Sequence, residues 1–228
     1  MKLIKILITI STAIIVPLII IFIGLRLLLT PVFLSIEYQL PGFPQDMYGF
    51  SQNERLVYSN IAMDYLLNGS EIDFLASQQF PDGSSLFNSR ELSHMEDVKN
   101  VVKPSLAIGY LTCILFIILG VLSISLKLTN PFLKGIRYGG WVILGLIAFI
   151  GIFALISFWN FFAVFHSLFF QGDSWIFSYS DTLIRLFPLK FWQDAFLFEG
   201  IFAIITSFVI LIFTKQRIRP HPQNTMEE

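Results

Sequence analysis

The sequence predicts an all-α polytopic membrane protein. Four transmembrane helices are expected, with a small, mainly helical extracellular domain between helices 1 and 2 and a shorter outer loop between helices 3 and 4. Of 228 residues, 55% are hydrophobic and 14% are charged, whereas a soluble domain has about 25% charged residues. The apolar residues also gather in four runs, each close to the roughly 20 residues that cross a bilayer core.

The four apolar runs are residues 4–29, 105–126, 138–164 and 195–213. The first follows Lys2 and Lys5 and therefore looks like a secretory signal sequence. It is too long for such a signal, and no small-residue cleavage site follows it. We therefore expect a retained anchor helix, which Pro17 would kink without breaking, since membrane helices tolerate proline.

The distribution of basic residues predicts the orientation of these spans. Three segments must share one side of the membrane, and each is basic: Lys2 and Lys5; Lys127, Lys134 and Arg137; Lys215, Arg217 and Arg219. Because basic loops stay in the cytoplasm, both termini are expected there. The predicted parts are helix 1 (1–30), an extracellular domain (31–104), helices 2–4 with an outer loop (105–213, loop 165–194) and a cytoplasmic tail (214–228).

The predicted extracellular domain contains one clear helical pattern. The stretch SQNERLVYSNIAMDYLLNGS (51–70) has polar starting residues, an apolar stripe and a glycine near its end, which predicts an amphipathic helix. The stretch before it, PVFLSIEYQLPGFPQ (31–45), contains three prolines and is predicted to be extended or looped.

A histidine precedes the second apolar run on a helix with its own start signal. Asn88 followed by Glu91 resembles a capping box, which predicts a helix from Ser89 into the second span. On this helix Glu91, His94 and Asp97 are spaced three apart and share a face. Either carboxylate could orient the His94 ring and raise its pKa.

A second histidine, His166, follows the third run on the same predicted side. Its neighbours are aromatic, and apolar surroundings lower an imidazole pKa, so the ring is expected to be neutral and basic. Two histidines at one membrane depth, in different surroundings, suit acid–base catalysis of acyl transfer. The plain alternative is that both rings anchor the chain at the membrane interface.

Other polar residues lie near the outer ends of the spans. Arg26, Asn160 and Glu199 are all predicted in the outer half of the membrane, level with the histidines. Ionisable residues buried in membranes are costly and often functional. A hydrophilic pocket open to the outer leaflet would use all three, whereas snorkelling to the headgroups is the plain alternative for Arg26 and Glu199.

The sequence argues against one class of partner and leaves two other functions open. Its net charge of −1 provides no basic field, so no nucleic acid partner is expected. The single cysteine, Cys113, lies within an apolar run. A membrane metallohydrolase using His94, His166 and Glu91 is possible by ligand count, although Glu91-x-x-His94 occurs only once and helical di-iron sites need this unit twice. A non-enzymatic membrane protein whose outer domain binds a partner is the third alternative.

Two stretches resemble a known family. FNSRELSHMEDVK (87–99) and FHSLFFQGDSWIFSYSDTLIRLFPLKFWQD (165–194) are similar to the signature stretches of the bacterial lipoprotein intramolecular transacylases. These are four-span membrane enzymes of Gram-positive bacteria, and the resemblance covers the chain in length, span count and loop order.

The resemblance implies an acyltransferase in the bacterial cell membrane, with its active site facing outside and no cofactor. Such enzymes move the sn-2 acyl chain of a diacylglyceryl-cysteine lipoprotein in the outer leaflet to the α-amine of its N-terminal cysteine, leaving a lyso-form lipoprotein. The family's catalytic histidines correspond to His94 and His166, with no metal. We assign His166 as base and His94 as acid. Trp175 is expected to cover the pocket at the level of the lipid headgroups, and Asp181 either caps a short helix or contacts substrate.

Overall fold

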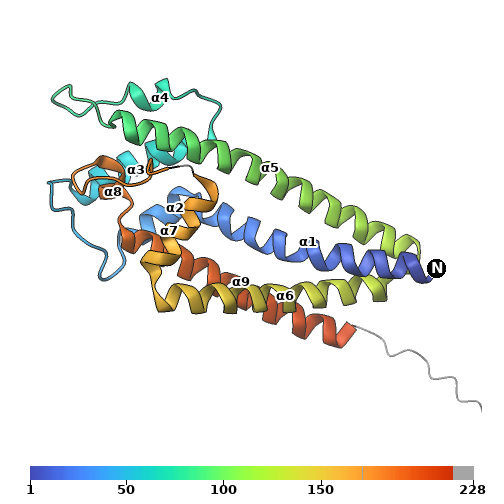
Figure 1. Cartoon of the computed structure of the whole chain (residues 1–228). Coiled ribbons are helices and arrows are strands. Elements are labelled where there is room, and N and C mark those ends of the chain that lie inside the picture. Colours follow the sequence, from blue (N-terminus) through green and yellow to red (C-terminus); the bar gives the residue numbers. More distant parts are fainter. Residues whose placement is uncertain (171, 218–228) are drawn as a thin grey trace, which may run out of the picture. The chain divides into compact units, whose positions relative to one another are not determined.

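The computed structural model describes residues 1–170 and 172–217, and this part of the chain is helical without a β-strand (Figure 1). The end of the predicted tail, including His221, lies outside the described residues. The helices are α1 (Lys2–Leu28), α2 (Pro31–Glu37), α3 (Gln52–Leu67), α4 (Asp73–Ala76), α5 (Ser89–Ser125), α6 (Thr129–Ile156), α7 (Phe158–Phe169), α8 (Thr182–Leu186) and α9 (Leu189–Arg217).

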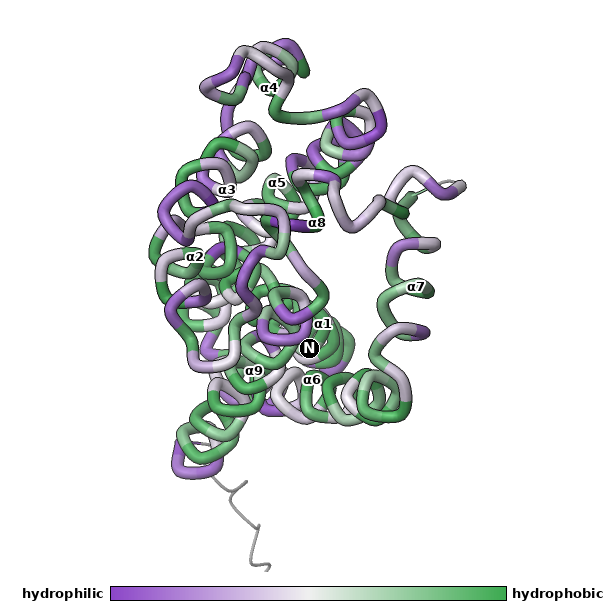
Figure 2. The backbone as a smooth tube through the Cα atoms, turned by 90° about the vertical axis from the view of Figure 1, so that its left-hand side faces the viewer, coloured by the Kyte–Doolittle hydropathy of each residue, from purple (hydrophilic) through white to green (hydrophobic). Residues whose placement is uncertain are grey.

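Four of these helices, α1, α5, α6 and α9, are long and apolar enough to cross a membrane, which confirms the predicted number of spans. In Figure 2 the tube of these helices is mostly green, the colour of hydrophobic residues. Helix α5 has 37 residues, a length of about 55 Å at 1.5 Å per residue, and this exceeds a bilayer core of about 30 Å. Its charged residues all lie before Pro104, so the membrane-spanning part of α5 begins near that proline and His94 precedes it.

The third predicted span differs from the structure. Residues 138–164 were expected to form one span, but α6 ends at Ile156 and α7 begins at Phe158. Between them Ser157 has an extended backbone (φ −158°, ψ 100°), and its side chain accepts a hydrogen bond from the Asn160 backbone N–H. A serine N-cap starts a new helix, and an apolar pattern alone does not reveal such a break.

The described residues form two compact units. Unit 1 contains Met1–Ile21, Gly109–Phe149 and the described residues from Ile201 onward. Within it α1 and α6 pack through glycine: a Cβ at Gly135 or Gly139 would lie 2.6 Å from the Cβ of Thr12 or Val16. These two positions allow the helix backbones to approach closely, as small residues do in membranes.

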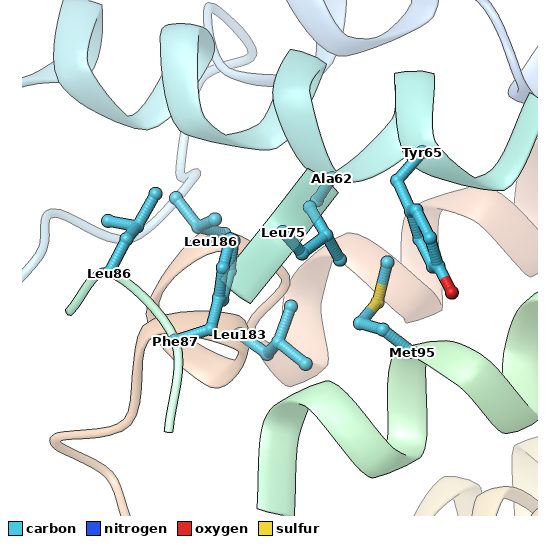
Figure 3. Packing of buried hydrophobic residues seen from close by; sticks show 8 residues of the cluster. All are labelled: Ala62, Tyr65, Leu75, Leu86, Phe87, Met95, Leu183 and Leu186. Carbon is cyan, nitrogen blue, oxygen red and sulfur yellow. The ribbon is translucent and has the colours of Figure 1, made fainter. Parts of the chain in front are cut away.

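Unit 2 contains Phe22–Ile108 and Ile150–Gly200. Its core is a cluster from α3, α4, α8, the start of α5 and the segment just before α5, seen from close by in Figure 3. The predicted helix over residues 51–70 is confirmed as α3: the Ser51 side chain accepts from the Glu54 N–H, and the Glu54 carboxylate accepts from the Ser51 N–H. The buried residues of the cluster are Ala62, Tyr65, Leu75, Leu86, Phe87, Met95, Leu183 and Leu186.

The prediction of an extended or looped stretch over residues 31–45 is wrong in its first half. Pro31–Glu37 forms α2, because Thr30 caps its N-terminus by accepting a hydrogen bond from the Phe33 N–H. Proline is favoured in the first turn of a helix, where its missing N–H costs nothing. In the sequence, Thr30 followed by Pro31 indicates the start of a helix. The prediction instead treated the prolines as residues that prevent helix formation.

One buried carboxylate connects the starts of α5 and α8. Glu91 is 1% exposed. One oxygen accepts from the Asn88 N–H at 2.8 Å, and the other accepts from the Leu183 N–H at 2.6 Å. The Asn88 side chain accepts from the Glu91 N–H at 3.1 Å, which confirms the predicted capping box. Glu91 thus caps its own helix and also satisfies an N–H at the start of α8.

We predict that Glu91→Gln destabilises the protein by about 1–3 kcal/mol, the range for removing a partner of buried hydrogen-bonding groups. The carboxamide retains one acceptor oxygen, but its NH2 group would face one of the two N–H donors. The thermal unfolding midpoint in detergent measures this loss. Glu96→Gln, an exposed change on the same helix, is the matched control, and equal midpoints for the two variants would contradict the prediction.

Candidate active site

His94 lies in the second turn of α5, on the part of the helix that precedes the membrane-spanning stretch. Its side chain is buried, with the residue 8% exposed. The ring lies between two aromatic residues of the segment that follows α7, with centroid distances of 5.0 Å to Phe170 and 5.3 Å to Phe177. Its Nδ1 is buried and has no hydrogen-bond partner among the described residues.

His166 lies in the last turn of α7 and is also buried. Its Nδ1 is 2.8 Å from the carbonyl oxygen of Phe162. A carbonyl oxygen only accepts hydrogen bonds, so Nδ1 carries the proton and Nε2 of the neutral ring carries a lone pair. The Trp175 ring lies 4.6 Å from the His166 ring.

The two histidines face one another within this aromatic enclosure. Their ring centroids are 6.2 Å apart and the ring planes differ by 22°. A substrate group that enters this enclosure can therefore meet both rings, and both rings could take part in proton transfer. Both histidines belong to unit 2, and their common depth in the membrane stays a prediction.

Burial keeps both rings neutral. Burial, together with a smaller contribution from the neighbouring His166, lowers the pKa of His94 to about 4. Burial also lowers the pKa of His166, against the opposing effect of its hydrogen bond to Phe162. The expectation that a carboxylate raises the pKa of His94 is wrong in direction. The Glu91 carboxylate is directed to the Asn88 and Leu183 N–H groups instead.

The other residues singled out in the sequence have different surroundings. Trp175 lies against His166, as described. Asp181 is at the N-cap position of α8, but its side chain makes no cap hydrogen bond there. It instead accepts from the Asn88 side chain at 3.1 Å and from the Ser178 N–H at 2.8 Å, which ties the loop before α8 to the start of α5.

The structure shows no polar contact of the histidine pair with three of the predicted site residues, Arg26, Asp97 and Asn160, within the described part of the chain. Arg26 and Asp97 are half-buried and Asn160 is exposed. Among the described residues, none of the three side chains makes a hydrogen bond or ion pair with either histidine. The hydrophilic pocket that was expected to join Arg26, Asn160 and Glu199 is thus not seen as a set of contacts.

Glu199 packs its carboxyl group against a glycine in unit 2. Its carboxyl lies over Gly24 of α1, where an added Cβ would be 1.9 Å from Oε2. Both carboxyl oxygens are buried and lack a hydrogen-bond partner among the described residues. Gly24 therefore makes room for a carboxyl group that the sequence places in a membrane span, a relation that the sequence analysis missed.

Sequence reasoning also missed the residues that hold the loop over the site. Phe177 contacts His94, and the Arg90 side chain donates a hydrogen bond to the Ile176 carbonyl at 3.2 Å. The loop has no periodic pattern from which these contacts could be inferred. The only available signal was the spacing of Arg90 and His94, which are four apart and share a face of α5.

The ligand set considered for a metallohydrolase is not assembled. Within residues 1–170 and 172–217, no group of three His, Cys, Asp or Glu side chains is placed to hold a metal ion. Glu91, the third ligand considered, uses its two oxygens for the starts of α5 and α8. His94 and His166 are left as a two-residue site.

Comparison with solved structures identifies the same fold. A structure of the membrane integral lipoprotein intramolecular transacylase Lit from Bacillus cereus matches with a TM-score of 0.76 and 19% identity, over 96% of this chain and 100% of that chain. A structure of the same protein with a histidine-to-alanine substitution matches with a TM-score of 0.67 and 20% identity, over 96% and 97%. The described spans therefore belong to a multi-pass membrane protein.

Sequence comparison extends the match to the family. An uncharacterized protein of Aquifex aeolicus (strain VF5) is 30% identical over 205 residues, which cover 90% of this chain and 92% of that protein. The family model for the lipoprotein intramolecular transacylase Lit matches residues 8–192, a range that contains both histidines and the loop between α7 and α9. The chain therefore belongs to the lipoprotein intramolecular transacylase family.

Proposed function

We propose that this protein moves the sn-2 acyl chain of a diacylglyceryl-cysteine lipoprotein to the α-amine of the same cysteine. The observation that carries the proposal is the His94–His166 pair, buried in an aromatic enclosure with ring centroids 6.2 Å apart. Family membership supports the reaction class. The product is a lyso-form lipoprotein with an N-acyl cysteine and a free glycerol hydroxyl.

This reaction needs little from the enzyme besides positioning and proton transfer. The ester and the amine belong to one molecule, and well-oriented intramolecular attack gains a large effective molarity. The amine itself is the nucleophile, so no acyl-enzyme is required. The enclosure would hold the lipid head so that amine and carbonyl meet between the rings, while Trp175 excludes water.

Two protons leave the ammonium nitrogen during transfer. His166 takes the first at Nε2, which its Nδ1–H bond to Phe162 leaves free, and releases it to bulk water after the product has left. The amine then attacks the ester carbonyl and forms the C–N bond. His94 takes the second proton and gives it to the glycerol oxygen as the C–O bond breaks. The low pKa of His94 makes its imidazolium a stronger acid than an ordinary one, which suits this second role.

The remaining residues receive supporting roles. Glu91 and Asp181 act as positioning residues, because they hold the start of α5 and the loop before α8. Arg26, Asn160 or a backbone N–H would stabilise the oxyanion, as acyl transfer requires. Asp97, half-buried one turn after His94, would attract the substrate ammonium.

The same reasoning assigns an orientation. The described part of unit 1 carries basic residues and no acidic ones: Lys2, Lys5, Lys127, Lys134, Arg137, Lys215 and Arg217. Cytoplasmic segments of membrane proteins carry this bias. We therefore place both termini and the tail 214–228 in the cytoplasm. Residues 31–104 and the loop 165–194 then lie outside, where the histidines meet lipoprotein substrate in the outer leaflet.

We predict that wild-type protein converts a diacylglyceryl lipoprotein to the lyso, N-acyl form in a bacterium that lacks this modification. His94→Ala and His166→Ala should each lower turnover by about 10²–10⁴-fold, the usual contribution of acid–base residues. Mass spectrometry of the N-terminal lipopeptide measures the product. His221→Ala, in the tail, is the matched control. Near-normal conversion by either variant, at equal expression in the membrane, would show that the pair is not catalytic.

The two histidines should differ in their dependence on pH. An α-amine has a pKa of about 7.7–8.0, so above pH 8.5 it no longer needs His166 to lose its first proton. The defect of His166→Ala should therefore shrink between pH 7 and 9, while that of His94→Ala persists. For wild type, kcat/KM should fall on the acid side with a midpoint below 6.5, because burial lowers both histidine pKa values. Parallel profiles for the two variants would reject the assigned roles.

Orientation can be tested with single cysteines in a Cys113→Ser background. Asp82 and Lys134 are both exposed, and Lys134 is in α6 of unit 1 while Asp82 is in unit 2. A membrane-impermeant maleimide should label Asp82→Cys in intact cells and Lys134→Cys only after permeabilisation. The reverse pattern would place the histidines on the cytoplasmic side and defeat the assignment.

A further inference from the structure

A polar hollow lies beside the histidine pair. It has a volume of about 480 Å³ and is lined by Arg90, Asp173, Ser174 and Ile176. This size falls within the range of about 300–1,000 Å³ that is typical of ligand sites. The mechanism described above does not use any of its four lining residues on a substrate.

The hollow is adjacent to the site through two elements. Arg90 is one turn before His94 on the same face of α5, on the side away from the membrane-spanning stretch. Ile176 lies in the chain between Trp175, which contacts His166, and Phe177, which contacts His94. The hollow therefore borders the aromatic enclosure at the end remote from the span of α5.

The lining offers both donors and acceptors. The Arg90 guanidinium donates to the Ile176 carbonyl at 3.2 Å. The group has five N–H donors, and within residues 1–170 and 172–217 the others make no hydrogen bond. The Asp173 carboxylate is exposed. The Ser174 hydroxyl is buried and has no hydrogen-bond partner among the described residues. A polypeptide backbone, which presents alternating N–H and C=O groups, matches such a lining.

We propose that this hollow receives the first residues of the substrate polypeptide that follow the lipidated cysteine. The inference rests on the proposed function. When the cysteine amine lies between the histidines, the chain must leave from its carbonyl toward water, while the acyl chains remain in lipid. The enclosure walls against the rings are aromatic, whereas the hollow supplies polar partners next to them. Its opposite charges would set a preference among side chains in that segment.

Synthetic diacylglyceryl lipopeptides test this inference. One series carries lysines after the lipidated cysteine, a second carries glutamates, and a lipidated cysteine amide without a polypeptide is the reference for each enzyme variant. The measured quantity is the ratio of kcat/KM for the lysine and glutamate peptides, each normalised to the amide. Asp173→Lys is compared with Glu96→Lys, which makes the same charge change on an exposed position of α5 outside the hollow.

Asp173→Lys should lower the lysine-to-glutamate ratio by about five-fold, the effect of one partly exposed charge pair of about 1 kcal/mol, and Glu96→Lys should leave it as in wild type. Asp173→Asn should give a smaller shift in the same direction, and it replaces Asp173→Lys if that variant fails to fold. Equal ratios in all variants would overturn the proposed role of the hollow in binding the polypeptide, while leaving acyl transfer intact. Failure of the wild type to convert even the amide would overturn the proposed function and this inference together.

Discussion

The geometry of the site depends on the buried Glu91 carboxylate. It joins two helix starts that are far apart in the sequence, by accepting hydrogen bonds from the Asn88 and Leu183 backbone N–H groups. Helix N-termini carry unsatisfied N–H groups and partial positive charge, so one carboxylate serves two of them. His94 is one turn further along α5, and its position therefore follows from where Glu91 holds the helix start. Thr182 strengthens the same junction through its hydrogen bond to the Leu86 carbonyl.

Around this junction unit 2 builds an apolar enclosure for two titratable rings. The aromatic contacts of His94 and His166 desolvate both imidazoles and lower both pKa values. The Glu91 carboxylate is hydrogen-bonded elsewhere and does not pair with His94. Such a pair would stabilise the imidazolium form and raise the pKa of His94. The Phe162 carbonyl then selects the tautomer of His166. Neutral rings are suited to accept protons, and the lone pair of His166 lies on Nε2 because its Nδ1 carries the proton.

Family membership and local geometry answer different questions about this protein. The family match and the fold comparisons identify a multi-pass transacylase relative. They do not assign roles to particular residues. Those roles are inferred from burial, tautomer and hydrogen bonds. The polar hollow lined by Arg90 and Asp173 is the place where we propose that the polypeptide of the substrate binds.

The sequence by itself determined the four spans, α3 and the continuous helix from Ser89, because apolar length, periodicity and capping residues act locally. It also singled out His94 and His166. It misjudged α2 and the break at Ser157, where one capping side chain outweighs the surrounding pattern. Only the tertiary structure decided the partner of Glu91, the 6.2 Å pairing of the histidines and the sign of the His94 pKa shift. Each of these depends on contacts between distant segments, and spacing along the chain does not encode which N–H group or ring a side chain will meet.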